Sequence, residues 1–370
     1  MKIFKTGMAV SFCLFLTFIT PLMIERGNNA AAAPSEKPIV LKFASYFPEV
    51  NTISQANLWW AKEIEKRTNG RVTFEFYWAG SLVKAADLAT ATGRGICDVA
   101  LLATGYTRAK FPITGIYEAV YITEKPDAAC RAMSELFETN DVFNAEWRSN
   151  NLYLLFFDML GPNIFGFKKK VEKLEDLRGL KIRTAGKMTD VTKRLGATAV
   201  SISSAEIYEG IDRGLIDGYT NTSLASAATR SFPEVAPFTL DPRMGNYACI
   251  ETAMNLRTWN NLPPDIKDIM KQVSIEVLGK SLEIMVADEN RVIEKMTTDW
   301  KATFYALSPD EAEKWKALVV PLYDGYIKDL EDKGLPGKEL FNSYRALAGK
   351  YEKESPYSQI YDRWLKRYGK

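Results

Sequence analysis

The sequence predicts an α/β protein in which strands and helices alternate in two successive units. Residues 39–102 alternate strand-like and helix-like segments, and residues 161–219 repeat this alternation. A helical pattern then runs over residues 265–300, and its length indicates a helix that bridges two lobes. Strands that alternate with helices are typical of parallel sheets covered by helices, so we expect a largely parallel sheet.

The first unit is predicted to contain three strands and two helices. The strands are residues 39–45, 71–78 and 96–102, and the first two alternate apolar with polar side chains. One helix runs from a cap at Asn51 or Thr52 to Arg67, and a second covers residues 82–92.

Ligands of parallel α/β sheets bind beyond the carboxyl ends of the strands. The segments that follow the three predicted strands are residues 45–48, 77–81 and 103–106. We therefore expect these segments to border a binding site.

The second unit is predicted to show the same alternation of strands and helices. Its expected strands and helices are residues 163–167, 180–183, 189–195, 203–213 and 215–219. Ser203 and Glu206 form a capping-box pattern, which predicts that a helix begins there.

Beyond the long helical segment, residues 302–307 are predicted as a strand. Ser308 should cap a helix that Pro309 opens, with Glu311 as its third residue. We expect the last helices, including an aromatic tail over residues 357–368, to pack on the outside.

The N-terminus has the layout of a cleaved secretory signal. Lys2 and Lys5 precede an apolar run over residues 8–24, and small residues precede Ala33, where we expect cleavage. The alternative is a membrane anchor, but the apolar run is short and Pro21 interrupts it. Residues 1–32 are therefore expected to direct export.

Composition excludes several kinds of chemistry. The chain has no histidine, which excludes Ser-His-Asp and Cys-His catalysis and every His-ligated zinc site. A net charge of +2 offers no excess charge for nucleic acid, so no such partner is expected. Cys97, Cys130 and Cys249 have a spacing that fits no metal motif. These three cysteines form either one disulfide with a free thiol or three buried thiols. We expect the protein to bind neither a metal nor a cofactor.

The most specific pattern lies in residues 174–223. Arg183 ends a short strand on which it and Lys181 face the side opposite to Ile182. A guanidinium can bind a carboxylate through two parallel hydrogen bonds, so Arg183 is the candidate anion-binding residue. The alternative is an arginine that is exposed or paired with a nearby acid.

The order DLRGLKIR, then SAEIYEGIDRGLIDG, then Asn221, together with GICD at residues 95–98, resembles the substrate-binding proteins of TRAP transporters. This DctP-like family of extracytoplasmic receptors captures organic acids and has no enzymatic activity. The resemblance implies a two-lobed periplasmic-binding-protein-like fold with a cleft between the lobes. It also implies that Arg183 pairs with the carboxylate of the substrate, that the amide of Asn221 reaches it, and that membrane subunits of a permease are partners.

The resemblance lets us assign residue ranges to the two predicted lobes. Lobe I is expected to comprise residues 36–160 and 247–286. Lobe II, which carries Arg183, is expected to comprise residues 161–246 and 287–345. A helical tail over residues 346–370 completes the chain, which we expect to be periplasmic and either a monomer or a homodimer.

The chain departs from the family pattern at three places. Asn163 stands where many members carry a second ligand-side arginine, and Ser204 where some have an aromatic ring. Lys84 follows the altered segment 81–83. A second carboxylate would then have no assured partner unless Lys84 or Arg243 reaches it. We expect a monocarboxylate, keto or aromatic acid rather than a C4-dicarboxylate.

Aromatic residues complete the predicted site. They are candidates to line a pocket for a bulky acid, namely Tyr77, Trp78, Tyr106, Tyr219 and Tyr247.

Two alternatives remain at this point. A receptor of an ATP-driven importer would bind another solute without depending on Arg183. An exported carboxylate-based hydrolase would need two acidic side chains that converge in one cleft, and 46 acidic residues make such pairs uninformative.

Overall fold

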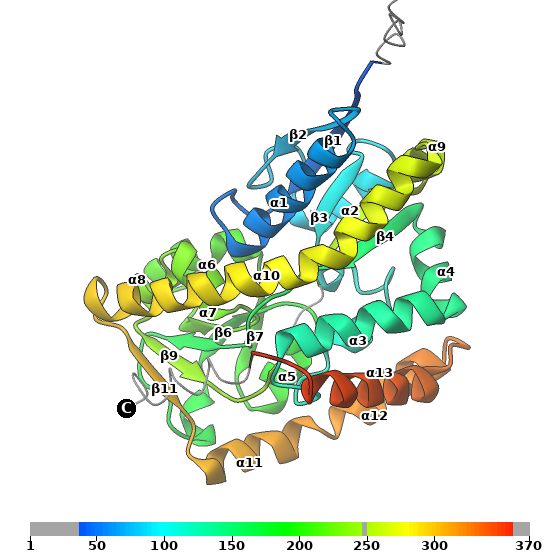
Figure 1. The fold of residues 1–370 in the computed structure, drawn as a ribbon. Coiled ribbons are helices and arrows are strands. Elements are labelled where there is room, and N and C mark those ends of the chain that lie inside the picture. Colours follow the sequence, from blue (N-terminus) through cyan, green and yellow to red (C-terminus); the bar gives the residue numbers. More distant parts are fainter. Residues whose placement is uncertain (1–36, 246–249, 358–370) are drawn as a thin grey trace, which may run out of the picture. The chain divides into compact units, whose positions relative to one another are not determined.

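The computed structural model describes residues 37–245 and 250–357 (Figure 1). The predicted signal, Tyr247, Cys249 and most of the predicted aromatic tail lie outside these described residues. Two β-sheets form the framework. One has five strands in the order β2-β1-β3-β10-β4, and the other has six in the order β11-β9-β5-β8-β6-β7.

The five-stranded sheet is only partly parallel. Its strands are β1 (Ile39–Ser45), β2 (Val72–Tyr77), β3 (Val99–Leu102), β4 (Leu152–Phe157) and β10 (Glu251–Asn255). β1 pairs in parallel with β2 and β3, whereas β10 runs antiparallel to both β3 and β4. The three strands predicted for this unit, β1, β2 and β3, pair in parallel as expected. β10 was not predicted, and it runs antiparallel because the chain returns from the other sheet and inserts it between β3 and β4.

The first helix of this unit begins where the sequence predicts. α1 (Thr52–Arg67) begins at Asn51, whose side chain accepts a hydrogen bond from the Ile53 N–H. The single helix predicted over residues 82–92 is wrong, because η1 (Ala85–Asp87), a 3-10 turn, precedes the short α2 (Leu88–Gly93). The remaining helices of this part were not predicted: η2 (Thr104–Thr107), η3 (Thr114–Glu118), α3 (Pro126–Thr139), α4 (Asp141–Ser149) and α9 (Leu256–Asn261).

The six-stranded sheet is also mixed. Its strands are β5 (Phe165–Phe167), β6 (Lys181–Thr184), β7 (Thr198–Ser201), β8 (Gly218–Tyr219), β9 (Phe238–Asp241) and β11 (Thr303–Ala306). β6 pairs in parallel with β7 and β8, and β5 is antiparallel to β8 and β9.

Both predicted caps in this half are confirmed. Ser203 and Glu206 form a reciprocal capping box before α6, and the Ser308 hydroxyl accepts from the Glu311 N–H at the start of α11. The helices and turns here are η4 (Leu174–Leu177), α5 (Met188–Arg194), η5 (Ser204–Glu206), α6 (Ile207–Asp212), α7 (Leu224–Thr229), α8 (Phe232–Val235), α11 (Pro309–Val319), α12 (Leu322–Glu331) and α13 (Gly337–Glu352).

The long predicted helix is present as α10 (Pro264–Thr298). It packs against α1, α3 and β4 at the five-stranded sheet and against α7, which follows β8 of the other sheet (Figure 1). Trp60 of α1 donates its indole N–H to Ser274 of α10 at 3.0 Å. A single rigid element therefore contacts the surroundings of both sheets, as the sequence predicts.

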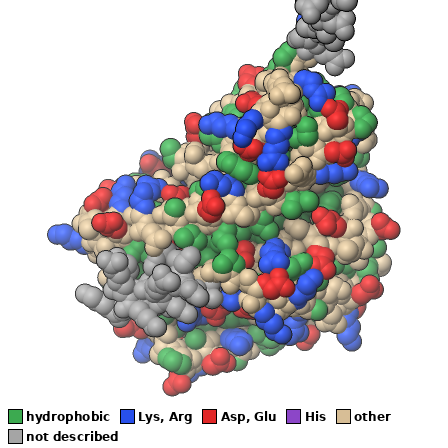
Figure 2. Space-filling model, viewed as in Figure 1, with side chains coloured by type: hydrophobic (Ala, Val, Ile, Leu, Met, Phe, Trp, Pro, Cys, Tyr) green, Lys and Arg blue, Asp and Glu red, His purple; other side chains and the backbone are tan. Residues whose placement is uncertain are grey.

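The molecular face shown in Figure 2 carries acidic and basic side chains interspersed, without a patch of one sign. Across the described parts of the chain, no helix combines the length and apolarity that crossing a bilayer requires. The same residues contain no cluster of three potential metal ligands. Cys97 and Cys130 are buried free thiols.

A buried hydrogen-bond network joins α1 to the five-stranded sheet around Asp158. The Asp158 carboxyl accepts from Asn57 Nδ2 at 2.5 Å and lies 2.7 Å from the Thr252 hydroxyl, which also lies 2.6 Å from Asn57 Oδ1. That hydroxyl has one hydrogen, so both of its contacts are satisfied only when Asp158 is protonated and donates. Burial accordingly raises the pKa of Asp158 to about 8.

The raised pKa predicts that the protein loses stability as the pH rises. The unfolded carboxyl titrates near pH 4, so the folded state binds the proton more tightly and the free energy of unfolding falls between about pH 4 and pH 8. Asp158→Asn, which mimics the protonated acid, should flatten this fall by up to a few kcal/mol. Urea unfolding at several pH values measures it. Exposed Glu313→Gln is the control, and an unchanged pH profile in Asp158→Asn contradicts the assignment.

Tyr219 lies in the core because a glycine faces it across the sheet. Gly166 of β5 is the register partner of Tyr219 on β8, and a Cβ at Gly166 would overlap the tyrosine ring. The ring also packs on Phe232 with centroids 5.1 Å apart. The prediction that Tyr219 lines the ligand pocket is therefore wrong.

Gly166→Ala should lower the free energy of unfolding by about 1–3 kcal/mol, because the added methyl group overpacks this contact. Gly279→Ala in α10 is the matched control, since a Cβ there meets nothing within 4 Å and alanine favours the helix. Thermal unfolding of both variants measures the difference. Equal melting temperatures for the two variants would refute the packing argument.

Candidate functional site

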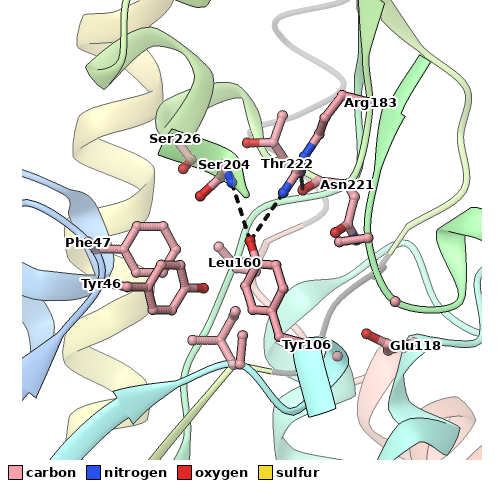
Figure 3. A pocket seen from close by; sticks show the side chains of 15 residues that line it. Tyr46, Phe47, Tyr106, Glu118, Leu160, Arg183, Ser204, Asn221, Thr222 and Ser226 are labelled. Atoms are coloured by element: carbon pink, nitrogen blue, oxygen red, sulfur yellow. Dashed lines mark hydrogen bonds between the residues drawn. The ribbon is translucent and has the colours of Figure 1, made fainter. Parts of the chain in front are cut away.

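A cavity lies among segments that belong to both sheets (Figure 3). Its wall includes Tyr46 and Phe47, which follow β1, and residues 103, 105 and 106, which follow β3. Two of the three predicted strand-end segments thus border the cavity. The third, residues 77–81, does not contribute to its wall.

Arg183 reaches the cavity from β6 and is 1% exposed. Its Nε donates to the carbonyl of Ile202 at 2.9 Å, and Nη1 donates to the carbonyls of Thr220 and Asn221 at 3.3 and 3.4 Å. Nη2 donates to the hydroxyl of Tyr106 at 3.1 Å. These contacts hold the guanidinium in a fixed plane at the cavity wall.

No carboxylate of the described residues neutralises the charge of Arg183. No acidic side chain within the described ranges forms an ion pair with it. The guanidinium has five hydrogens and makes four hydrogen bonds, so one hydrogen on Nη2 has no acceptor from the described chain. A buried charge without a counter-charge is costly, so this geometry is suited to an anion that arrives from outside.

The Tyr106 hydroxyl occupies the position where two donors converge. It accepts from Arg183 Nη2 and, at 3.4 Å, from the backbone N–H of Ser204 (Figure 3). Tyr106 comes from η2 beyond the five-stranded sheet, whereas both donors belong to the six-stranded sheet and the turn that follows it. The hydroxyl oxygen therefore connects the two halves.

Asn163 acts on the site through its neighbours. It is fully buried, and its Oδ1 accepts from the Thr220 hydroxyl at 3.1 Å and from the Asn221 N–H at 3.0 Å. These bonds fix the turn in which Asn221 adopts a φ of 61° and turns its carbonyl toward Arg183. Asn221 and Ser204 line the cavity, and Asn163 supports it from behind.

Three other predicted residues lie away from this cavity. Trp78 stacks on Phe76 with centroids 4.8 Å apart, on the outer part of the five-stranded sheet. Lys84 is exposed at the start of η1. Arg243 forms an ion pair with Glu124 at 3.4 Å. None of the three belongs to the cavity wall, because local packing or a surface partner already holds each one.

Sequence reasoning missed two charged residues near the cavity. Glu118 lines it from η3 and is 3% exposed, and burial raises the pKa of its carboxyl. Arg230 donates to the Ser204 hydroxyl at 2.8 Å and lies over the Phe47 ring at 5.0 Å. Neither residue follows a strand or belongs to a motif, so no sequence pattern identified it.

Two sheets joined by a long helix, with a buried cation at a cavity between them, define a binding protein for small anionic solutes. The model of the DctP family, bacterial extracellular solute-binding protein family 7, matches residues 43–329. The chain therefore belongs to this family of TRAP solute-binding proteins, which are not enzymes.

Similar proteins support the same fold. A solute-binding protein of Albidiferax ferrireducens is 26% identical over 277 residues, which are 74% of this chain and 76% of that protein. A TRAP solute-binding protein of Rhodoferax ferrireducens, solved with copurified benzoate, is 25% identical with a TM-score of 0.77 over 85% of this chain and 99% of the other.

A marine metagenome TRAP solute-binding protein specific for aromatic acids, solved with metahydroxyphenylacetate, has a TM-score of 0.78 at 23% identity. The match covers 85% of this chain and 99% of that one. Other similar proteins are described as binding 2-oxoacids, C4-dicarboxylates or galacturonate. The range of organic acids across these proteins is wide, so the family alone does not select a substrate class.

Tyr106→Phe should destabilise the unliganded protein by about 1–2 kcal/mol, because two buried donors lose their shared acceptor. Chemical unfolding without ligand measures this. Tyr77→Phe is the control, since that hydroxyl contacts Glu75 on the exposed surface. Equal unfolding free energies for the two variants would mean that the Tyr106 hydroxyl does not satisfy Arg183.

Proposed function

We propose that this chain is the periplasmic receptor of a TRAP-type transporter and that it captures a monocarboxylic organic acid, of the keto or aromatic type, for delivery to membrane subunits. The observation that carries the proposal is Arg183, a buried guanidinium without a carboxylate partner in the described chain. Two similar proteins, from Nostoc and from Rhodobacter capsulatus, are described as periplasmic. This supports a periplasmic location for the chain.

The carboxylate of the ligand would take the place of the Tyr106 hydroxyl. One oxygen can accept from Arg183 Nη2 and the other from the Ser204 N–H, since both donors already converge on a single oxygen. Charge-assisted hydrogen bonds are roughly twice as strong as neutral ones, so a carboxylate competes favourably with a phenolic hydroxyl. Binding would then exchange a neutral acceptor for an anion and neutralise the buried cation.

The remainder of the cavity favours an apolar ligand body with one negative charge. Tyr46, Phe47, Leu160 and Ile250 contribute rings and aliphatic groups to the wall. Arg183 is the only Lys or Arg among the described residues that line the cavity. A C4-dicarboxylate would need a second cation, whereas a monocarboxylate would not.

We also propose that ligand binding closes two lobes, with residues 36–160 and 247–286 in one and residues 161–246 and 287–345 in the other. Support comes from the cavity wall, to which both sheets contribute, and from contacts such as Tyr106 to Arg183 that cross between them. Closure would exclude water and strengthen the ion pair.

Arg183→Ala should weaken carboxylate binding about 30-fold to several-thousand-fold, because the loss of one partner of a desolvated charge pair costs about 2–5 kcal/mol. A thermal-shift screen of wild type and variant against organic acids, sugars and amino acids measures this. Arg183→Lys should restore the charge but only part of the affinity, since an ammonium lacks the planar fork.

Arg213→Ala is the control for this experiment, because that arginine is exposed and pairs with Glu209 of α6 on the surface. It should bind like the wild type. Unchanged carboxylate affinity in Arg183→Ala, or hits only among neutral sugars, would refute the proposed function.

A further inference from the structure

We propose that Glu118 determines specificity at the end of the ligand remote from Arg183, where it selects against acids that carry a second carboxylate. This inference rests on the proposed function and adds to it a residue that acts by repulsion. It concerns the same cavity but a different group, which comes from η3 and not from the sheet that carries Arg183.

The two oxygens of the Glu118 carboxyl differ in their hydrogen bonding. Oε2 accepts from the backbone N–H of Lys187 at 2.9 Å. Within the part of the chain that the structure describes, Oε1 makes no hydrogen bond. A carboxyl oxygen this well buried normally has a donor, so Oε1 is available to a group on the ligand.

Two glycines leave the space that this oxygen occupies at the cavity wall. A Cβ at Gly105 or at Gly186 would overlap Glu118 Oε1, and both glycines line the cavity together with Glu118. Gly186 also has a φ of 54°, which side chains rarely adopt. The two backbone segments approach closely at this point, and the carboxyl fills the space between them.

Glu118 and Arg183 lie apart in the cavity, which gives it two ends of opposite charge. In Figure 3 Arg183 lies among Asn221, Thr222 and Ser204, while Glu118 lies beyond Tyr106. A monocarboxylate that binds Arg183 can present an apolar group or a hydroxyl donor toward Glu118. A dicarboxylate of the same skeleton brings a second anion toward it, and like charges at close range are strongly unfavourable.

Charged groups of both signs surround Glu118, and the charges of Lys187 and Arg108 favour its ionised form. The Lys187 ammonium lies 3.9 Å from the centre of the Tyr326 ring, and Arg108 pairs with Asp190 at 3.0 Å. Glu251 lies on the other side and accepts from Thr104, and its charge and that of Glu118 disfavour each other. The titratable and charged groups that face Glu118 or border the space behind it are Arg108, Lys187, Asp190, Glu251, Tyr326, Asp329 and Lys333.

The test compares acids that share one skeleton and differ by one carboxylate. Isothermal titration would measure benzoate against isophthalate and butyrate against succinate, with wild type, Glu118→Gln and Asp190→Asn. The glutamine keeps the acceptor for the Lys187 N–H, so the fold should persist. Asp190→Asn removes a negative charge near Glu118 but outside the cavity wall.

The wild type should bind the monoacid of a pair at least tenfold more tightly than its diacid, which corresponds to about 1.4 kcal/mol. Glu118→Gln should reduce this ratio about tenfold, whereas Asp190→Asn should change it no more than about twofold. An unchanged ratio in Glu118→Gln overturns the proposal, and an equal change in both variants assigns the effect to general charge instead.

A second measurement needs no variant. Burial raises the pKa of Glu118, so the ratio in the wild type should grow as the pH rises and more of this carboxyl ionises. A ratio that stays constant as the pH rises contradicts the proposal even if Glu118→Gln does not fold.

The same measurements distinguish failure of the receptor function from failure of the role of Glu118. If the wild type binds none of these acids, both proposals are overturned. If it binds a monoacid that Arg183→Ala no longer binds, but shows no preference over the diacid, the receptor function stands and the role of Glu118 is overturned.

Discussion

The arrangement of the site depends on one buried guanidinium. Arg183 is held by three backbone carbonyls and a tyrosine hydroxyl, and no carboxylate of the described chain neutralises it. Dipoles of this kind fix the orientation of a charge without cancelling it, which is the basis of the proposed affinity for an external anion.

Around Arg183, segments from two separate parts of the chain meet at one cavity. The six-stranded sheet supplies the cation and the turn at Asn221, which buried Asn163 fixes. Segments beyond the five-stranded sheet supply Phe47 and Tyr106, which form the opposite wall. The long helix α10 contacts elements of both halves, so changes in one half can be transmitted to the other through a rigid element.

Much of this was accessible from the sequence, and the omissions have physical causes. Capping boxes, strand alternation and the position of Arg183 are local properties, and the structure agrees with them. β10 was missed because its position between β3 and β4 depends on pairing between distant segments. Glu118 was missed for the same reason, since only the folded chain places its carboxyl between Gly105 and Gly186. Tyr219 was misjudged because a glycine on the neighbouring strand makes room for its ring in the core.

The most direct test of the central claim is a crystal structure of the protein grown with benzoate. The account predicts that the carboxylate lies within hydrogen-bonding distance of Arg183 Nη2 and the Ser204 N–H, with the Tyr106 hydroxyl moved from the position it holds between them. Benzoate bound elsewhere, or bound in this cavity while Tyr106 keeps its contact with Arg183 and the carboxylate points away, would contradict it.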